Sequence, residues 1–116
     1  MMDIEQLRLF CLGLPAVTED VKWEADLCFS VGGKMFCVAG LEAPFKASLK
    51  VPDEAFETLT QQPGIVPAPY LARAKWVQVS EAARLNKKEW EDLITQSYQL
   101  IKVKLTKKTQ KELGLA

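Results

Sequence analysis

The stretch Leu27-Cys28-Phe29-Ser30-Val31-Gly32-Gly33-Lys34-Met35-Phe36-Cys37-Val38-Ala39 predicts a β-hairpin. Leu27, Phe29 and Val31 alternate with other residues, which is typical of a strand with one buried face. Gly32 and Gly33 readily adopt the positive φ angles of a tight turn, so the chain returns as a second strand. This part of the chain therefore indicates an antiparallel sheet.

Three further strands are expected beyond the hairpin. Ala47, Leu49 and Val51 alternate with Lys46, Ser48 and Lys50, which predicts a strand with one core face and one wet face. Residues 65–80 contain Pro67 and Pro69, but Val77 and Val79 lie beside Trp76 and favour β structure. We expect two short strands there, on either side of an irregular segment.

Helices are predicted before, between and after these strands. Asp3 and Gln6 have capping-box spacing at the start of the first helix, which ends at Pro15 and is followed by an acidic turn at residues 18–20. A short second helix follows Pro52. Asn86 and Glu89 start a long third helix, and its apolar face is expected to contain Trp90, Leu93, Ile94, Ser97, Tyr98, Ile101 and Leu105. The tail, residues 107–116, either adds one more helical turn or frays.

The predicted order of elements is α-β-β-β-α-β-β-α. Helices and strands in this order favour a two-layer α+β domain, with an antiparallel sheet that carries its helices on one face. The chain has 116 residues, 48% of them hydrophobic and 26% charged, which is typical of one compact domain. We therefore expect residues 1–116 to form a single domain.

The composition argues against several kinds of site. The chain contains no histidine, and Cys11, Cys28 and Cys37 lack the spacing of metal ligands, so no metal is expected and the three thiols are predicted to lie in the core. The odd cysteine count and the lack of a leader segment favour the cytoplasm. No apolar run approaches the roughly 20 residues that a membrane span requires.

Catalysis is not expected. A serine or cysteine nucleophile lacks a histidine base, and no cofactor motif is present. Glu24 and Asp26, beside Trp23, are the nearest candidates for acid–base work, although a solvated acidic edge strand explains them better. The sequence therefore favours a binding protein without cofactor over an enzyme. A deep pocket lined by Trp23, Tyr70 or Trp76 would instead indicate an enzyme or a small-molecule binder.

Basic and aromatic residues alternate on the predicted strands and suggest nucleic-acid binding. Cations contact phosphates, and exposed aromatic rings stack on bases. The candidate nucleic-acid-binding residues are Lys34, Lys46, Lys50, Tyr70, Arg73, Lys75 and Trp76. Each also has a structural interpretation, Trp76 as a core residue and the lysines as a solubilising face. A formal net charge of zero is unusual for a dedicated DNA-binding protein.

The C-terminal segment carries a second basic feature. Five lysines and no acidic residue occur within residues 99–111. Such a bias favours an anionic partner. The alternative is a solvated helix end whose lysines complement the macrodipole.

The chain resembles the bacterial MmcQ/YjbR-like family across nearly its whole length. The resemblance rests on Leu14-Pro15-Ala16-Val17-Thr18-Glu19, Val31-Gly32-Gly33-Lys34-Met35-Phe36, the segment from Pro69-Tyr70 to Lys75-Trp76-Val77, and the segment from Ser97-Tyr98 to Lys104-Leu105-Thr106-Lys107-Lys108. It implies a fold likened to CyaY and to secretion chaperones, and a double-wing DNA-binding motif. The chain departs from the family pattern at Lys75, where histidine is common, and at Thr106, where proline is common.

Two functions follow from the resemblance. In the first, the turn at Gly32-Gly33 and the connection from Tyr70 to Trp76 act as wings on DNA, and the basic residues position phosphates. In the second, the domain has the shape of a secretion chaperone and binds a protein client or a second copy. The first predicts strong salt dependence, and the second predicts salt-tolerant association and an exposed apolar patch.

Overall fold

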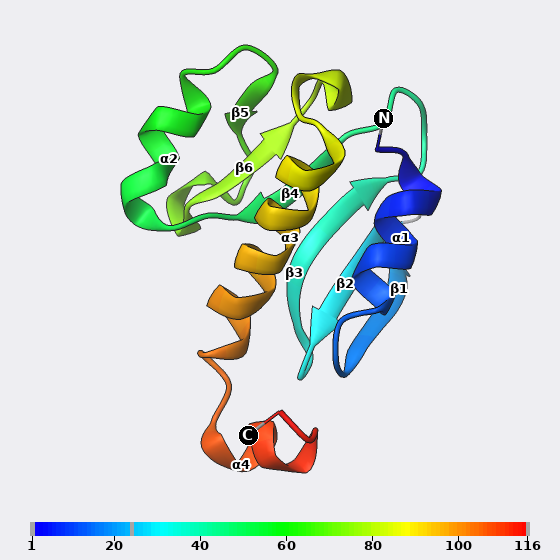
Figure 1. The fold of residues 1–116 in the computed structure, drawn as a ribbon, viewed down its shortest axis with the longest axis vertical. Coiled ribbons are helices and arrows are strands. Elements are labelled where there is room, and N and C mark those ends of the chain that lie inside the picture. The colour runs from blue at the N-terminus through cyan, green and yellow to red at the C-terminus, as the bar shows by residue number, and fades with distance from the viewer. Residues whose placement is uncertain (1, 24, 116) are drawn as a thin grey trace.

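The computed structural model describes residues 2–23 and 25–115, and its centre is a six-stranded antiparallel sheet in the order β1-β2-β3-β4-β6-β5 (Figure 1). The strands are β1 Val17–Lys22, β2 Asp26–Val31, β3 Lys34–Gly40, β4 Ala47–Lys50, β5 Ile65–Pro67 and β6 Trp76–Val79. The helices are α1 Ile4–Leu12, α2 Asp53–Thr60, α3 Lys87–Lys102 and α4 Lys107–Glu112, with short 3₁₀ turns at Ala72–Ala74 and Ala82–Arg84.

Helices α1 and α3 lie on the same face of the sheet, in front of the strands in Figure 1. Helix α2 lies beside β5 and β6, and its Phe56 and Leu59 pack against the same core. The opposite face of the sheet has no helix across it in the described chain, and we call it the open face. The predicted α+β class, with helices on one face of an antiparallel sheet, is confirmed.

One strand replaces a predicted turn. The acidic turn expected at residues 18–20 is wrong, because β1 pairs with β2 from Val17 opposite Val31 to Lys22 opposite Asp26. Acidic residues disfavour strands in general, but β1 is an edge strand, where charged side chains reach water. Glu19 faces α1 and accepts two hydrogen bonds from the Arg8 guanidinium, at 2.8 and 2.7 Å.

Both predicted helix caps are present. The Asp3 carboxylate accepts a hydrogen bond from the Gln6 backbone N–H at 2.8 Å, and Asn86 and Glu89 form a reciprocal capping box at the start of α3. The end of α3 differs from the prediction, because the helix stops at Lys102 and Leu105 belongs to the following segment. The tail then forms α4, whose N-cap is Thr106.

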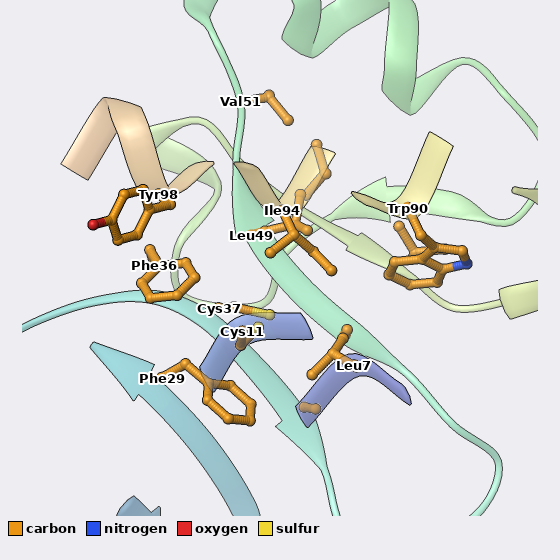
Figure 2. Packing of buried hydrophobic residues seen from close by; sticks show 14 of the residues in the cluster. Leu7, Cys11, Phe29, Phe36, Cys37, Leu49, Val51, Trp90, Ile94 and Tyr98 are labelled. Carbon is orange, nitrogen blue, oxygen red and sulfur yellow. The ribbon is translucent and has the colours of Figure 1, made fainter. Parts of the chain in front are cut away.

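The core lies between the sheet and the two helices, as Figure 2 shows for Phe29, Phe36, Leu49, Trp90 and Tyr98. All three cysteines are buried free thiols, as predicted. A hydrogen bond with the Cys11 thiol, together with burial, raises the pKa of Cys37 well above its usual value. The Cys37 thiol therefore stays protonated at neutral pH and contributes to packing.

A serine on α3 connects the helix to the sheet. The buried Ser97 hydroxyl donates to the Phe36 carbonyl oxygen at 2.6 Å and accepts from the Lys50 backbone N–H at 2.9 Å. One turn of α3 is thereby fixed over the ends of β3 and β4. A buried group that satisfies two backbone partners is costly to remove.

Two features of the described residues bear on the wider predictions. No helix within residues 2–23 and 25–115 combines the length and hydropathy that crossing a bilayer requires. In the same part of the chain, no three cysteine or acidic side chains gather in a geometry suited to a metal ion.

Candidate functional site

The open face contains a groove of about 690 Å³. Its floor is made by side chains that alternate with core residues on three neighbouring strands: Val38 lies opposite Ser48 in the β3–β4 register, and Ser48 lies opposite Gln78 in the β4–β6 register. Its sides are lined by Trp23, which follows β1, and by Pro69, Tyr70 and Leu71 from the connection between β5 and β6. The lining residues are Trp23, Asp26, Met35, Val38, Gly40, Lys46, Ser48, Pro69, Tyr70, Leu71 and Gln78.

Two exposed aromatic side chains line this groove. Trp23 is 67% exposed and Tyr70 is fully exposed, and the other aromatic residues of the described chain are buried or half-buried. Both residues have left-handed backbones, with φ of 53° for Trp23 and 65° for Tyr70. That conformation costs a residue with a Cβ atom roughly 1–2 kcal/mol. Neither residue recovers this energy by burying its ring.

The groove also contains polar groups without protein partners. Ser48 and Gln78 lie on its floor, and Asp26 and Lys46 carry opposite charges at its lining. Among the described residues, no side-chain hydrogen bond or ion pair involves any of the four. Donors and acceptors thus face an otherwise apolar groove and are free for a ligand.

Some of the predicted nucleic-acid-binding residues lie on this face, but they are not equally accessible. Lys46 and Tyr70 line the groove. Trp76 is only 5% exposed, so it is not placed to stack on bases and has the alternative structural role. Lys50 is 9% exposed, and its ammonium group donates a hydrogen bond to the Ala74 carbonyl oxygen. The wet face expected around Ser48 and Lys50 is therefore largely buried.

Arg73 and Lys75 lie on the connection that leads into β6. Arg73 is exposed, whereas the Lys75 ammonium lies 4.9 Å from the centroid of the Phe56 ring, a cation–π contact with α2. Lys75 has a left-handed φ of 63°. Lys75 thus attaches the connection to α2. Of the acid–base candidates, Asp26 lines the groove and Glu24 lies outside the described residues.

The remaining predicted residue, Lys34, lies at another surface. Leu105 packs directly on the β2–β3 turn, because a Cβ atom on Gly32 would lie 2.7 Å from Leu105 Cδ2. The hairpin tip and the C-terminal segment therefore meet, and Figure 1 shows α4 beyond that end of the sheet. We call the lysines gathered here the basic end. They are the exposed residues Lys34, Lys104, Lys107, Lys108 and Lys111.

The helix dipole explains only some charges of the basic end, among them that of Lys111, which lies in the last turn of α4. Lys102 lies in the last turn of α3, where a cation is favourable, but Lys107 and Lys108 lie in the first turn of α4, which has no acidic residue. Cations are unfavourable at that position. Within the described chain, no member of the basic end forms an ion pair. Burial, and then the positive charge of Lys104, lower the pKa of Lys50.

A model of the YjbR family matches residues 12–100. The chain belongs to the YjbR family. A crystal structure of a Deinococcus radiodurans protein with a DUF419 domain is similar, with a TM-score of 0.90 and 31% identity over 100% of this chain and 91% of that one. A Pseudomonas syringae protein shares the fold, with a TM-score of 0.74 and 24% identity over 86% of this chain and 99% of that one. No protein with a curated description matches the sequence.

Sequence reasoning missed two features of this YjbR protein. Trp23 was considered as a neighbour of acidic residues and as one possible lining residue of a pocket, but its exposure depends on a left-handed backbone that the sequence does not signal. The lysines of residues 99–111 were noticed, but their meeting with Lys34 depends on Leu105, which was expected on α3. A break after Lys102, recognised from Thr106 as an N-cap, would have located α4.

Proposed function

We propose that this YjbR protein is a DNA-binding protein without catalytic activity, and that its basic end lies along the phosphate backbone. The observation that carries this proposal is the unbalanced first turn of α4. Lys107 and Lys108 oppose the helix dipole there, the first turn contains no acidic residue, and Leu105 packs on the hairpin turn that precedes Lys34. A phosphate backbone supplies the negative charge that the fold itself does not provide.

The zero net charge is compatible with this role, because the charge is unevenly distributed. Residues 1–31 contain six acidic and two basic residues, whereas residues 86–116 contain four acidic and seven basic residues. Association depends on the local potential that the partner meets. Lys87 and Lys88 lie at the far end of α3, so the bias that matters is that of residues 99–111, which contain five lysines and no acidic residue.

The chemistry of the basic end suits contacts to the backbone better than the reading of bases. All five residues are lysines, whose ammonium groups act as flexible point charges. They lack the planar pair of donors that an arginine guanidinium offers. Lysine contacts to phosphate release counterions and add affinity with little sequence preference. Lys34 is a member of the basic end and is exposed, whereas Lys50 is buried and is not proposed to contact phosphate.

The test is the salt dependence of DNA binding. A labelled duplex is titrated with the protein at a series of salt concentrations, and binding is followed by fluorescence anisotropy. If most of the five lysines contact phosphates, log Kd should rise steeply with log salt, with a slope of roughly 3–5. Absence of binding at low salt would contradict the proposal. Salt-tolerant association with a protein would instead support the interaction module of secretion-chaperone shape.

A further inference from the structure

We propose that the groove on the open face binds an unpaired nucleobase of a DNA strand, stacked against Trp23 and Tyr70. This inference rests on the proposed DNA binding and adds the form of DNA that is recognised. A groove of about 690 Å³ lies within the range of small-ligand sites, which is roughly 300–1,000 Å³. A paired base inside a duplex cannot enter it, so the base comes from a single strand or is extruded.

The walls of the groove fit the faces of a base. Trp23 and Tyr70 are the exposed aromatic residues of the described chain, and both line this one groove. Each lies in a backbone conformation in which glycine would cost less. Their rings supply stacking surfaces, and any base offers a flat face in return.

The floor of the groove fits the edge of a base. Gln78 and Ser48 lie opposite each other on β6 and β4, and neither side chain has a partner in the described chain. The glutamine amide offers one donor and one acceptor side by side, which matches the paired groups on a base edge. A wholly apolar occupant would leave both groups buried and unsatisfied, which is costly. An occupant with flat apolar faces and a polar edge is therefore favoured.

The two charges indicate how the nucleotide lies. Lys46 provides a cation for the phosphate, whereas Asp26 repels phosphate and accepts hydrogen bonds from an exocyclic amino group. The backbone therefore passes on the Lys46 side of the groove. Lys46 and Tyr70 retain the DNA-contacting role predicted from the sequence, although at a different surface from the basic end.

The experiment compares two single strands of equal length and equal charge, one with its bases and one made only of abasic sites. Both offer the same phosphates, so the ratio of their affinities isolates the contribution of the bases. We expect the base-containing strand to bind about 5- to 150-fold more tightly for each stacked base. It should also quench the fluorescence of Trp23, since Trp76 and Trp90 are buried.

Variants separate the groove from the basic end. Trp23→Gly and Tyr70→Gly relieve the left-handed strain, so they should fold normally while the affinity ratio falls towards one. Lys107→Glu/Lys108→Glu should weaken both strands equally and leave the ratio unchanged. Thermal melting of each variant verifies that it is folded.

Each of the remaining outcomes would contradict either the base site alone or the base site together with the proposed DNA binding. Equal affinities of the wild-type protein for the two strands would overturn the base site and leave backbone binding intact, as expected if the groove holds a peptide segment instead. An affinity ratio that survives Tyr70→Gly and Trp23→Gly would place the base elsewhere. If neither strand nor duplex binds at low salt, the base site and the proposed function both fail.

Discussion

Leu105 lies directly against Gly32, so that a Cβ atom on the glycine would approach Leu105 Cδ2 to 2.7 Å. This contact joins the β2–β3 hairpin to the segment that leads into α4. It brings Lys34 to the lysines near the C-terminus and so creates the basic end. The position of the proposed DNA surface thus depends on the absence of a side chain at Gly32, which lets Leu105 pack on the turn.

Gly32→Ala should therefore destabilise the protein more than Gly33→Ala. Both glycines have positive φ angles, of 59° and 81°, but a Cβ atom on Gly33 would meet nothing within 4 Å. The difference between the two variants should be roughly 1–3 kcal/mol in the free energy of unfolding, the usual range for overpacking. Urea denaturation measures it. Equal effects would mean that Leu105 does not fix the C-terminal segment on the turn.

Tyr70→Gly should leave the stability nearly unchanged or raise it slightly. The relief of a left-handed backbone gains roughly 1–2 kcal/mol, and glycine loses roughly 0.5–1 kcal/mol through its greater freedom in the unfolded chain. The ring is fully exposed, so little packing is lost. Thermal melting compares this variant with Trp76→Gly, whose buried ring should cost roughly 3–5 kcal/mol. A large loss for Tyr70→Gly would show that this residue is structural.

Ser97→Ala should destabilise the fold by about 1–3 kcal/mol. It removes the hydroxyl that binds the Phe36 carbonyl and the Lys50 backbone N–H, and it leaves both groups buried without that partner. Ser30→Ala is a suitable control, because Ser30 is half-buried and its hydroxyl bonds no described residue. If the two variants unfold at the same denaturant concentration, the hydrogen bonds of Ser97 do not hold α3 on the sheet.

The Arg8 and Glu19 pair should respond to acid. The hydrogen bond from Arg8 lowers the pKa of Glu19 below its usual 4.5. A carboxylate with a depressed folded-state pKa contributes stability above pH 4.5, and this contribution is lost as pH falls through the folded value. NMR titration of the Glu19 side chain should show a pKa that rises in Arg8→Ala. An unchanged pKa in that variant would show that the contact is not maintained in solution.

Much of the fold follows from local sequence signals. The Gly32-Gly33 hairpin and the caps at Asp3 and Asn86 are determined by residues within a few positions of each other, and all three predictions were confirmed. Strand β1 was missed because acidic residues disfavour strands locally, whereas pairing with the next strand, β2, and the ion pair between Arg8 and Glu19 hold this segment extended. Tertiary context therefore outweighed the local preference of Glu19 and Asp20.

The candidate site was less predictable than the fold. Alternation assigned Ser48 and Lys50 to the face opposite the core, but it did not reveal that both are largely buried there. The exposure of Trp23 and Tyr70 depends on two left-handed residues that no local motif signals. The sequence showed the lysines of residues 99–111, but it did not reveal that Leu105 packs on Gly32 and so places this segment beside the β2–β3 turn.

The central claim is that the basic end contacts DNA phosphates, and one paired measurement tests it most directly. The salt dependence of duplex binding is compared between Lys107→Glu/Lys108→Glu and Lys87→Glu/Lys88→Glu. Both variants reverse two exposed lysines in the first turn of a helix, but the second pair lies at the start of α3, the end of that helix remote from α4 in Figure 1. We predict that the first variant loses affinity and that its salt slope falls by about 2, while the second binds like the wild type. Equal slopes and affinities in the two variants would contradict the account.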